Sequence, residues 1–105
     1  MKSIGLALTL REGAYDEYKK RHDEIWPEMV EALNSCEITM VIYKRENTLF
    51  VHQRAPSEES FVKMGAHPIT PKWNDHMAEV LETDAKGNIV FEMLPLAFGF
   101  GEFQE

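Results

Sequence analysis

The chain has one cysteine, Cys36, among its 105 residues. A single thiol cannot form a disulfide within the chain, so the cysteine content does not favour a secreted protein. We therefore expect a reduced, cytoplasmic setting. The N-terminal segment has one short apolar run, Ile4 to Leu10, and no cleavage-site pattern. That run is too short to span a bilayer, so we expect no membrane association.

Basic clusters are also scarce. The longest is Lys19-Lys20-Arg21, and the formal net charge is −7. An acidic chain repels phosphate backbones, which argues against nucleic acid as the main ligand. The sequence contains no glycine-rich phosphate loop, nucleophile elbow, HExxH motif or cysteine–histidine cluster, and His67 and His76 form no metal motif. We expect neither a metal nor a cofactor.

The composition is that of an ordinary soluble globular protein, with 44% hydrophobic and 28% charged residues. Its length suits one domain, and we take residues 1–105 as that domain. A core of this size is modest, so stability shared with a second copy of the chain is a natural expectation.

Hydrophobic periodicity predicts strands at 3–10, 37–44 and 48–55, a helical segment from residue 14, and a strand-like tail after 88. The turn of the central hairpin is predicted at 45–47. Ser57 should cap a helix that stops at Gly65, and Thr70 should cap another that has Pro71 in its first position. Pro95 and two nearby glycines place the tail at a sheet edge or an irregular end.

The resulting order is β-α-β-β-α-β, with the second helical region in two pieces. This predicts an α+β fold with a ferredoxin-like antiparallel sheet. Helices on one face would leave the other face bare, and a second subunit is the simplest cover. We expect a homodimer that encloses a ligand cavity between two sheet faces.

One stretch, "YKKRHDEIWPEM", combines helical spacing with chemistry. Tyr18 and His22 lie four residues apart, so they should be neighbours on one helix face, and Trp26 continues the stripe. Such an aromatic stripe is more often core, but an imidazole beside a phenol can also transfer protons near neutral pH. Pro27 cannot donate to the carbonyl of Asp23, so the helix should break near Asp23 and restart at Pro27.

The predicted hairpin supplies two further candidates. With a three-residue turn, Met40 would lie opposite His52, and both would face one side of the sheet. A histidine on a strand is of interest if it faces a cavity and not if it faces solvent.

The same stretch resembles the signature of the L-rhamnose mutarotase family, in which Tyr, His and Ile-Trp-Pro-Glu recur in the first helix. "VIYKRENTLF" is similar to the hairpin of that family, "PSEESF" to its next helix start, and "PKWNDHM" to its tryptophan segment. The similarity extends to about Glu82 and weakens in the tail.

The resemblance implies a dimeric α/β barrel that interconverts the α and β anomers of L-rhamnopyranose without metal or cofactor. By position, His22 would be the proton donor, and Tyr18 and Trp73 would contact the sugar. Two positions depart from the family pattern. Met40 stands where the family has a sugar-binding tyrosine, and Asn74 replaces the second residue of a frequent Trp-Trp pair.

These departures keep alternatives open. One is a mutarotase for a related deoxy sugar such as L-fucose, and another is a non-catalytic sugar-binding module of the same fold. A cofactor-free monooxygenase on the same barrel architecture has only fold analogy behind it. A histidine that transfers protons near pH 7 fits mutarotation, which requires no covalent intermediate. Tyr18, His52 or a water molecule could be the second proton-transfer group.

Overall fold

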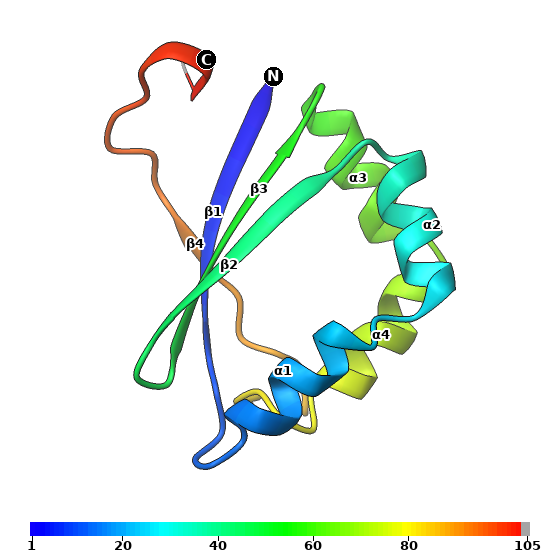
Figure 1. Ribbon diagram of the computed structural model, residues 1–105, viewed down its shortest axis with the longest axis vertical. Helices are drawn as coiled ribbons and strands as arrows, with labels where there is room; N and C mark the ends of the chain where they lie inside the picture. Colours follow the sequence, from blue (N-terminus) through cyan, green and yellow to red (C-terminus); the bar gives the residue numbers. More distant parts are fainter. Residues whose placement is uncertain (104–105) are drawn as a thin grey trace.

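Four strands form one antiparallel sheet in the computed structural model, which describes residues 1–103 (Figure 1). They are β1 (Lys2–Thr9), β2 (Thr39–Arg45), β3 (Thr48–Ala55) and the short β4 (Glu92–Leu94). Their order in the sheet is β2-β3-β1-β4, with β1 and β3 in the centre. This is the ferredoxin-like arrangement predicted from the sequence.

All the main helices of the described chain lie on one side of this sheet (Figure 1). They are α1 (Tyr15–Asp23), α2 (Pro27–Ser35), α3 (Glu58–Ala66) and α4 (Ile69–Met77), and a short 3₁₀ helix, η1 (Gly101–Phe103), follows near the end. None of these helices has the length and apolar character needed to cross a membrane.

The predicted helix break is confirmed. The first helix ends at Asp23, and the second begins at Pro27. Trp26 is extended, with φ −63° and ψ 139°, as expected for a residue before proline. Pro27 occupies the first helical position, where its missing N–H costs no intrahelical hydrogen bond.

The predicted hairpin register is wrong by one residue. The turn contains two residues, 46 and 47, because Arg45 pairs with Thr48. Met40 therefore lies opposite Gln53, while His52 lies opposite Val41. Successive side chains alternate between the faces of a strand, so this shift places Met40 and His52 on opposite faces of the sheet.

Two helix boundaries also differ from the prediction. The third helix continues through Gly65 to Ala66, and Ser57 precedes it without a side-chain capping hydrogen bond. The fourth helix begins at Ile69, so Thr70 lies inside it and does not cap it. The Thr70 hydroxyl instead donates to the carbonyl of Met64, 2.6 Å away, and so satisfies a free carbonyl near the end of α3.

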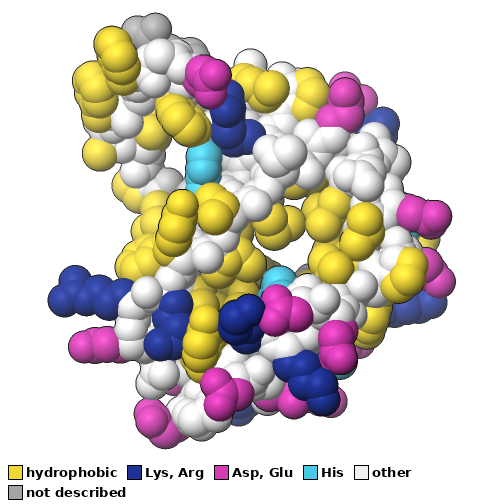
Figure 2. All heavy atoms as spheres, viewed as in Figure 1, with side chains coloured by type: hydrophobic (Ala, Val, Ile, Leu, Met, Phe, Trp, Pro, Cys, Tyr) yellow, Lys and Arg dark blue, Asp and Glu magenta, His cyan; other side chains and the backbone are white. Residues whose placement is uncertain are grey.

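The hydrophobic core lies between the helices and the sheet face that they cover. Leu10 and Leu49 are its most buried large side chains, each 1% exposed. The opposite face carries Val41, Tyr43 and Phe50, which are all exposed. Figure 2 shows hydrophobic side chains gathered over this helix-free side of the sheet.

The chain beyond β4 returns toward the helix-free face near the start of β1 (Figure 1). Arg54 binds Glu102 there, at 3.3 Å, and its guanidinium lies over the ring of Phe103. That ring also lies 5.2 Å from the ring of His52. Phe98 and Phe100 in the same segment are about three-quarters exposed, at 77% and 76%.

Candidate active site

A cavity of about 290 Å³ lies between the helices and the covered face of the sheet. Its size is near the lower end for small-molecule sites. Five residues singled out from the sequence line it together: Tyr18, His22, Met40, Trp73 and Asn74. The sequence had suggested a cavity between two sheet faces. This cavity instead lies within a single chain, on the opposite side of the sheet.

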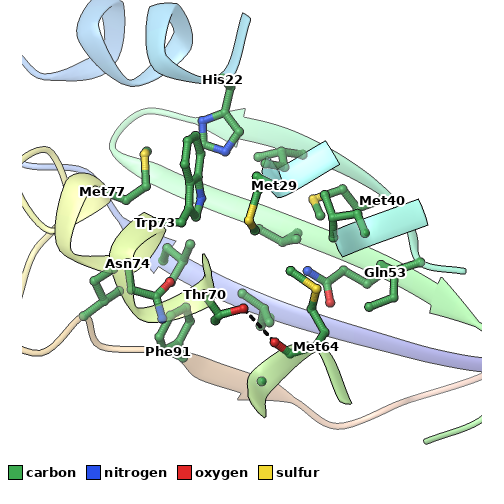
Figure 3. A pocket seen from close by; sticks show the side chains of 18 of the residues that line it. His22, Met29, Met40, Gln53, Met64, Thr70, Trp73, Asn74, Met77 and Phe91 are labelled. Carbon is green, nitrogen blue, oxygen red and sulfur yellow. Dashed lines mark hydrogen bonds between the residues drawn. The ribbon is translucent and has the colours of Figure 1, made fainter. Parts of the chain in front are cut away.

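His22 from α1 and Trp73 from α4 meet at one end of the cavity (Figure 3). Their ring centroids are 5.4 Å apart, in an edge-to-face arrangement at 83°. The ring of Tyr18, one turn earlier on α1, is 4.4 Å from that of His22. The predicted Tyr18–His22 neighbour pair is therefore present, and Trp73 forms a flat wall beside it.

The protonation of His22 follows from its contacts. Its Nδ1 lies 3.2 Å from the backbone carbonyl of Tyr18. A carbonyl can only accept, so Nδ1 carries the proton, and Nε2 of the neutral ring keeps its lone pair. Burial lowers the pKa of His22, although the Tyr18 carbonyl and the charge of Asp23 act in the other direction. At neutral pH the ring is thus a base available through Nε2.

Tyr18, in contrast to His22, is not available as a base at neutral pH. Its side chain is only 4% exposed. Burial raises the pKa of the phenol well above its usual range, with a smaller contribution from Tyr15. Tyr18 therefore stays protonated at neutral pH, and its hydroxyl can donate or accept a hydrogen bond but does not serve as a ready base.

Contacts outside the cavity lining join α1 and the start of α2 to α4 and the residues after it. Trp26 packs edge-on against Trp73 at 5.1 Å, and its other neighbour is His76 at 4.9 Å. Arg21 donates to the backbone carbonyl of His76 and pairs with Glu79 at 2.9 Å. Trp26 therefore packs against α4 without lining the cavity. His76 does not line it either.

His52 is not brought to this cavity. It lies on the helix-free face, beside a separate hollow formed with the C-terminal segment, and it contacts Phe103. The two-residue turn explains this position. The sequence-based grouping of His52 with Met40 does not hold.

Sequence reasoning missed two polar residues of the lining, Gln53 and Thr70. Gln53 is the cross-strand neighbour of Met40. Counting the hairpin turn as two residues would have found it. The predicted helix cap at Thr70 is not formed, because its hydroxyl donates a hydrogen bond to the carbonyl of Met64.

Within residues 1–103, no cluster of three or more His, Cys, Asp or Glu side chains is arranged to hold a metal ion. The cavity lining supplies one imidazole, one phenol, two amides, the hydroxyl of Thr70 and an indole wall. This set suits hydrogen bonding to a polar ligand and proton transfer at one end of it.

Comparison with known proteins gives a consistent result. Residues 3–97 match the family model described as L-rhamnose mutarotase. The L-rhamnose mutarotase of Phocaeicola vulgatus is 39% identical over 93% of this chain and 97% of its own length. That of Rhizobium etli is 35% identical over 73% of this chain and 76% of its own.

Solved structures agree on the fold. The crystal structure of an L-rhamnose mutarotase from Formosa agariphila superposes with a TM-score of 0.81 and 26% identity, covering 96% of this chain and 100% of that one. A dimeric ferredoxin-like protein from an uncultured marine organism superposes with a TM-score of 0.59 at 16% identity, covering 94% of this chain and 91% of its own. The second likeness bears on the fold alone.

Proposed function

The chain belongs to the L-rhamnose mutarotase family, and from this premise we propose that it interconverts the α and β anomers of L-rhamnopyranose. The observation that supports the proposal most is the shared cavity of Tyr18, His22 and Trp73. A proton-transfer group stands there beside an aromatic wall, in a space of the size of a small ligand. The enzyme would be an isomerase.

Mutarotation requires two proton transfers around one carbon. A base removes the proton of the anomeric hydroxyl, the bond between C1 and the ring oxygen breaks, and the ring oxygen takes up a proton. The aldehyde then turns about the C1–C2 bond, and reclosure on its other face reverses both transfers. Positioned acid–base groups typically accelerate such steps by about 10²–10⁴-fold.

We assign both roles of the acid–base cycle to His22. Neutral His22 accepts the hydroxyl proton at Nε2, and the imidazolium so formed donates a proton to the ring oxygen. Both oxygens are bonded to C1, so one imidazole can reach each in turn. The Tyr18 hydroxyl and a water molecule are the other candidates for the second transfer. His52 is no longer a candidate for the second proton transfer, because it faces away from the cavity.

We propose that Tyr18, Trp73, Asn74 and Met40 contact the sugar, since all of them line the cavity with His22. The Trp73 indole offers an apolar surface to the C–H side of a pyranose, and the Asn74 amide can donate to or accept from hydroxyls. Met40 offers an apolar contact that would suit a deoxygenated carbon.

Residues 1–105 would act as one domain, and the protein as a homodimer, with a second copy on the helix-free face. The exposed side chains of Val41, Tyr43 and Phe50 favour this, because large apolar patches are rare on soluble monomers. The single, buried Cys36 is the ground for proposing a cytoplasmic location.

Exchange between anomers tests the proposal directly. Proton NMR exchange spectroscopy would be run on L-rhamnose, L-fucose and D-glucose, with and without the protein. We expect exchange to be enhanced for L-rhamnose. The second candidate, an L-fucose mutarotase, is motivated by Met40 and Asn74, and a larger enhancement on L-fucose would favour it. A sugar that binds without enhanced exchange would indicate a non-catalytic module and contradict the proposal.

A further inference from the structure

One polar side chain lies on the sheet side of the cavity. Apart from Gln53, the sheet and the segments that flank it line the cavity with aliphatic, aromatic and thioether side chains, such as Leu6, Val51, Phe91 and Met40. Of the described residues on this side of the cavity, only Gln53 carries a hydrogen-bonding amide. The other polar groups of the lining, including His22 and Asn74, come from the helices.

Among residues 1–103, the amide of Gln53 makes no hydrogen bond to another side chain or backbone group, and Figure 3 draws none to it. Its neighbour across the strand is Met40, whose thioether is at best a weak acceptor. Gln53 is partly buried, and its amide is not one of the fully buried polar groups, so the amide remains accessible. An amide with a donor and an acceptor free is therefore suited to a ligand in the cavity.

Figure 3 shows where that ligand contact would lie. Gln53 enters the cavity from the sheet, close to Met40 and Met64, whereas His22 and Trp73 stand at the far end. A sugar whose anomeric carbon sits at His22 would direct its remote hydroxyls toward Gln53. The amide can donate to one hydroxyl and accept from another.

We propose that Gln53 is a specificity-determining residue, which hydrogen-bonds to a sugar hydroxyl remote from the anomeric carbon. This inference rests on the proposed function, because it places the anomeric carbon at His22. The proposed contact should affect the apparent affinity for the sugar and the maximal exchange rate differently. A contact remote from the reacting atoms is made equally in the ground state and the transition state, so it sets the apparent affinity and leaves the maximal exchange rate nearly unchanged.

The test is Gln53→Met, which keeps a long unbranched side chain and removes the amide. Exchange rates would be measured against L-rhamnose concentration. We expect the half-saturating concentration to rise by about two- to twelvefold, the effect of one lost hydrogen bond, with little change in the maximal rate. Thermal unfolding of the sugar-free variant should occur close to the wild-type temperature, because the Gln53 amide is partly buried and makes no hydrogen bond within the described chain.

Two further variants sharpen the result. Arg54→Met changes the next residue of β3, which points to the other face, and should leave the half-saturating concentration unchanged. Met40→Tyr in the Gln53→Met background places a phenol directly across from the lost amide, within the usual 4.5–5.5 Å of cross-strand neighbours, and should restore part of the affinity. Gln53→Leu serves if the methionine variant folds poorly.

Tryptophan fluorescence titration with L-rhamnose separates this inference from the proposed reaction. Wild type that binds sugar without enhanced exchange would end the mutarotase proposal, and weaker binding by Gln53→Met would still support the contact. Wild-type affinity in Gln53→Met would overturn the contact, even if His22 proves essential. A maximal rate that falls as much as the affinity would also overturn it.

Discussion

Replacing His22 by alanine tests the proposed chemistry most directly, because the structure provides a matched control in His76. Each ring is partly buried, and each contacts two aromatic neighbours, one of which is Trp73 in both cases. Only His22 lines the cavity. The two alanine variants therefore remove similar packing and differ in the group that could transfer a proton.

The expected magnitudes can be worked out from these contacts. An aromatic pair is worth about 0.5–1.5 kcal/mol beyond its burial, so either variant should lose about 1–3 kcal/mol of unfolding free energy. A domain with the usual 5–15 kcal/mol stays folded after that loss. Loss of a general acid–base group should slow anomer exchange about 100-fold or more, which is about 2.7 kcal/mol in the barrier.

The assay is NMR anomer exchange on L-rhamnose, together with thermal unfolding of both variants. His22→Ala should lose nearly all enhancement, while His76→Ala should keep most of it at a similar unfolding temperature. Added imidazole should restore part of the exchange in His22→Ala, because the truncation leaves space in the cavity. Near wild-type exchange in a folded His22→Ala variant would refute the assignment. Equal losses in both variants would attribute the effect to packing.

Two other predictions concern pH and assembly. Burial lowers the pKa of His22 below its ordinary value of about 6.5, and the active form is the neutral base, so wild-type exchange should persist below pH 6.5 and fall only at lower pH. The unfolded chain binds that proton more readily, so unfolding free energy should fall as pH drops from 6.5 toward the folded pKa, and the fall should be smaller in His22→Ala. Light scattering at micromolar concentration should give a dimeric mass for wild type, and Tyr43→Lys should reduce it, because a charge would enter the proposed interface; a monomeric wild type would contradict the homodimer.

The structural features that the sequence predicted correctly are those determined by residues close together in the chain. Pro27 acts on its immediate neighbours, so a break near Asp23 and a restart at Pro27 were predicted, and both are found. The spacing of Tyr18 and His22 likewise fixed their contact once a helix was assumed. The junction of α3 and α4 offered competing signals in Gly65, Thr70 and the prolines, and the choice among them was decided by tertiary contacts such as that of Thr70 with Met64.

The hairpin register and the place of the cavity were beyond local reasoning. Turns of two and three residues were both compatible with Arg45-Glu46-Asn47, yet the choice moves every side chain of a strand to the other face. Periodicity also cannot tell which face of a sheet will carry a ligand site. His52 was therefore placed with Met40, while Gln53, the real neighbour, passed unnoticed.

The alternation of side chains along β3 separates the proposed sugar site from the proposed dimer interface. Val51 and Gln53 point into the cavity, while Phe50, His52 and Arg54 point to the helix-free face. A second copy seated on that face would touch none of the side chains that line the cavity from this strand. Binding and assembly then become separable by substitution at adjacent positions, since each residue of a strand belongs to one face. The two faces still share one backbone, so a partner that stiffens the central strands would also hold Gln53 in place. Dimer formation would then affect the site by making the sheet more rigid, and the partner would contribute no side chain to the cavity.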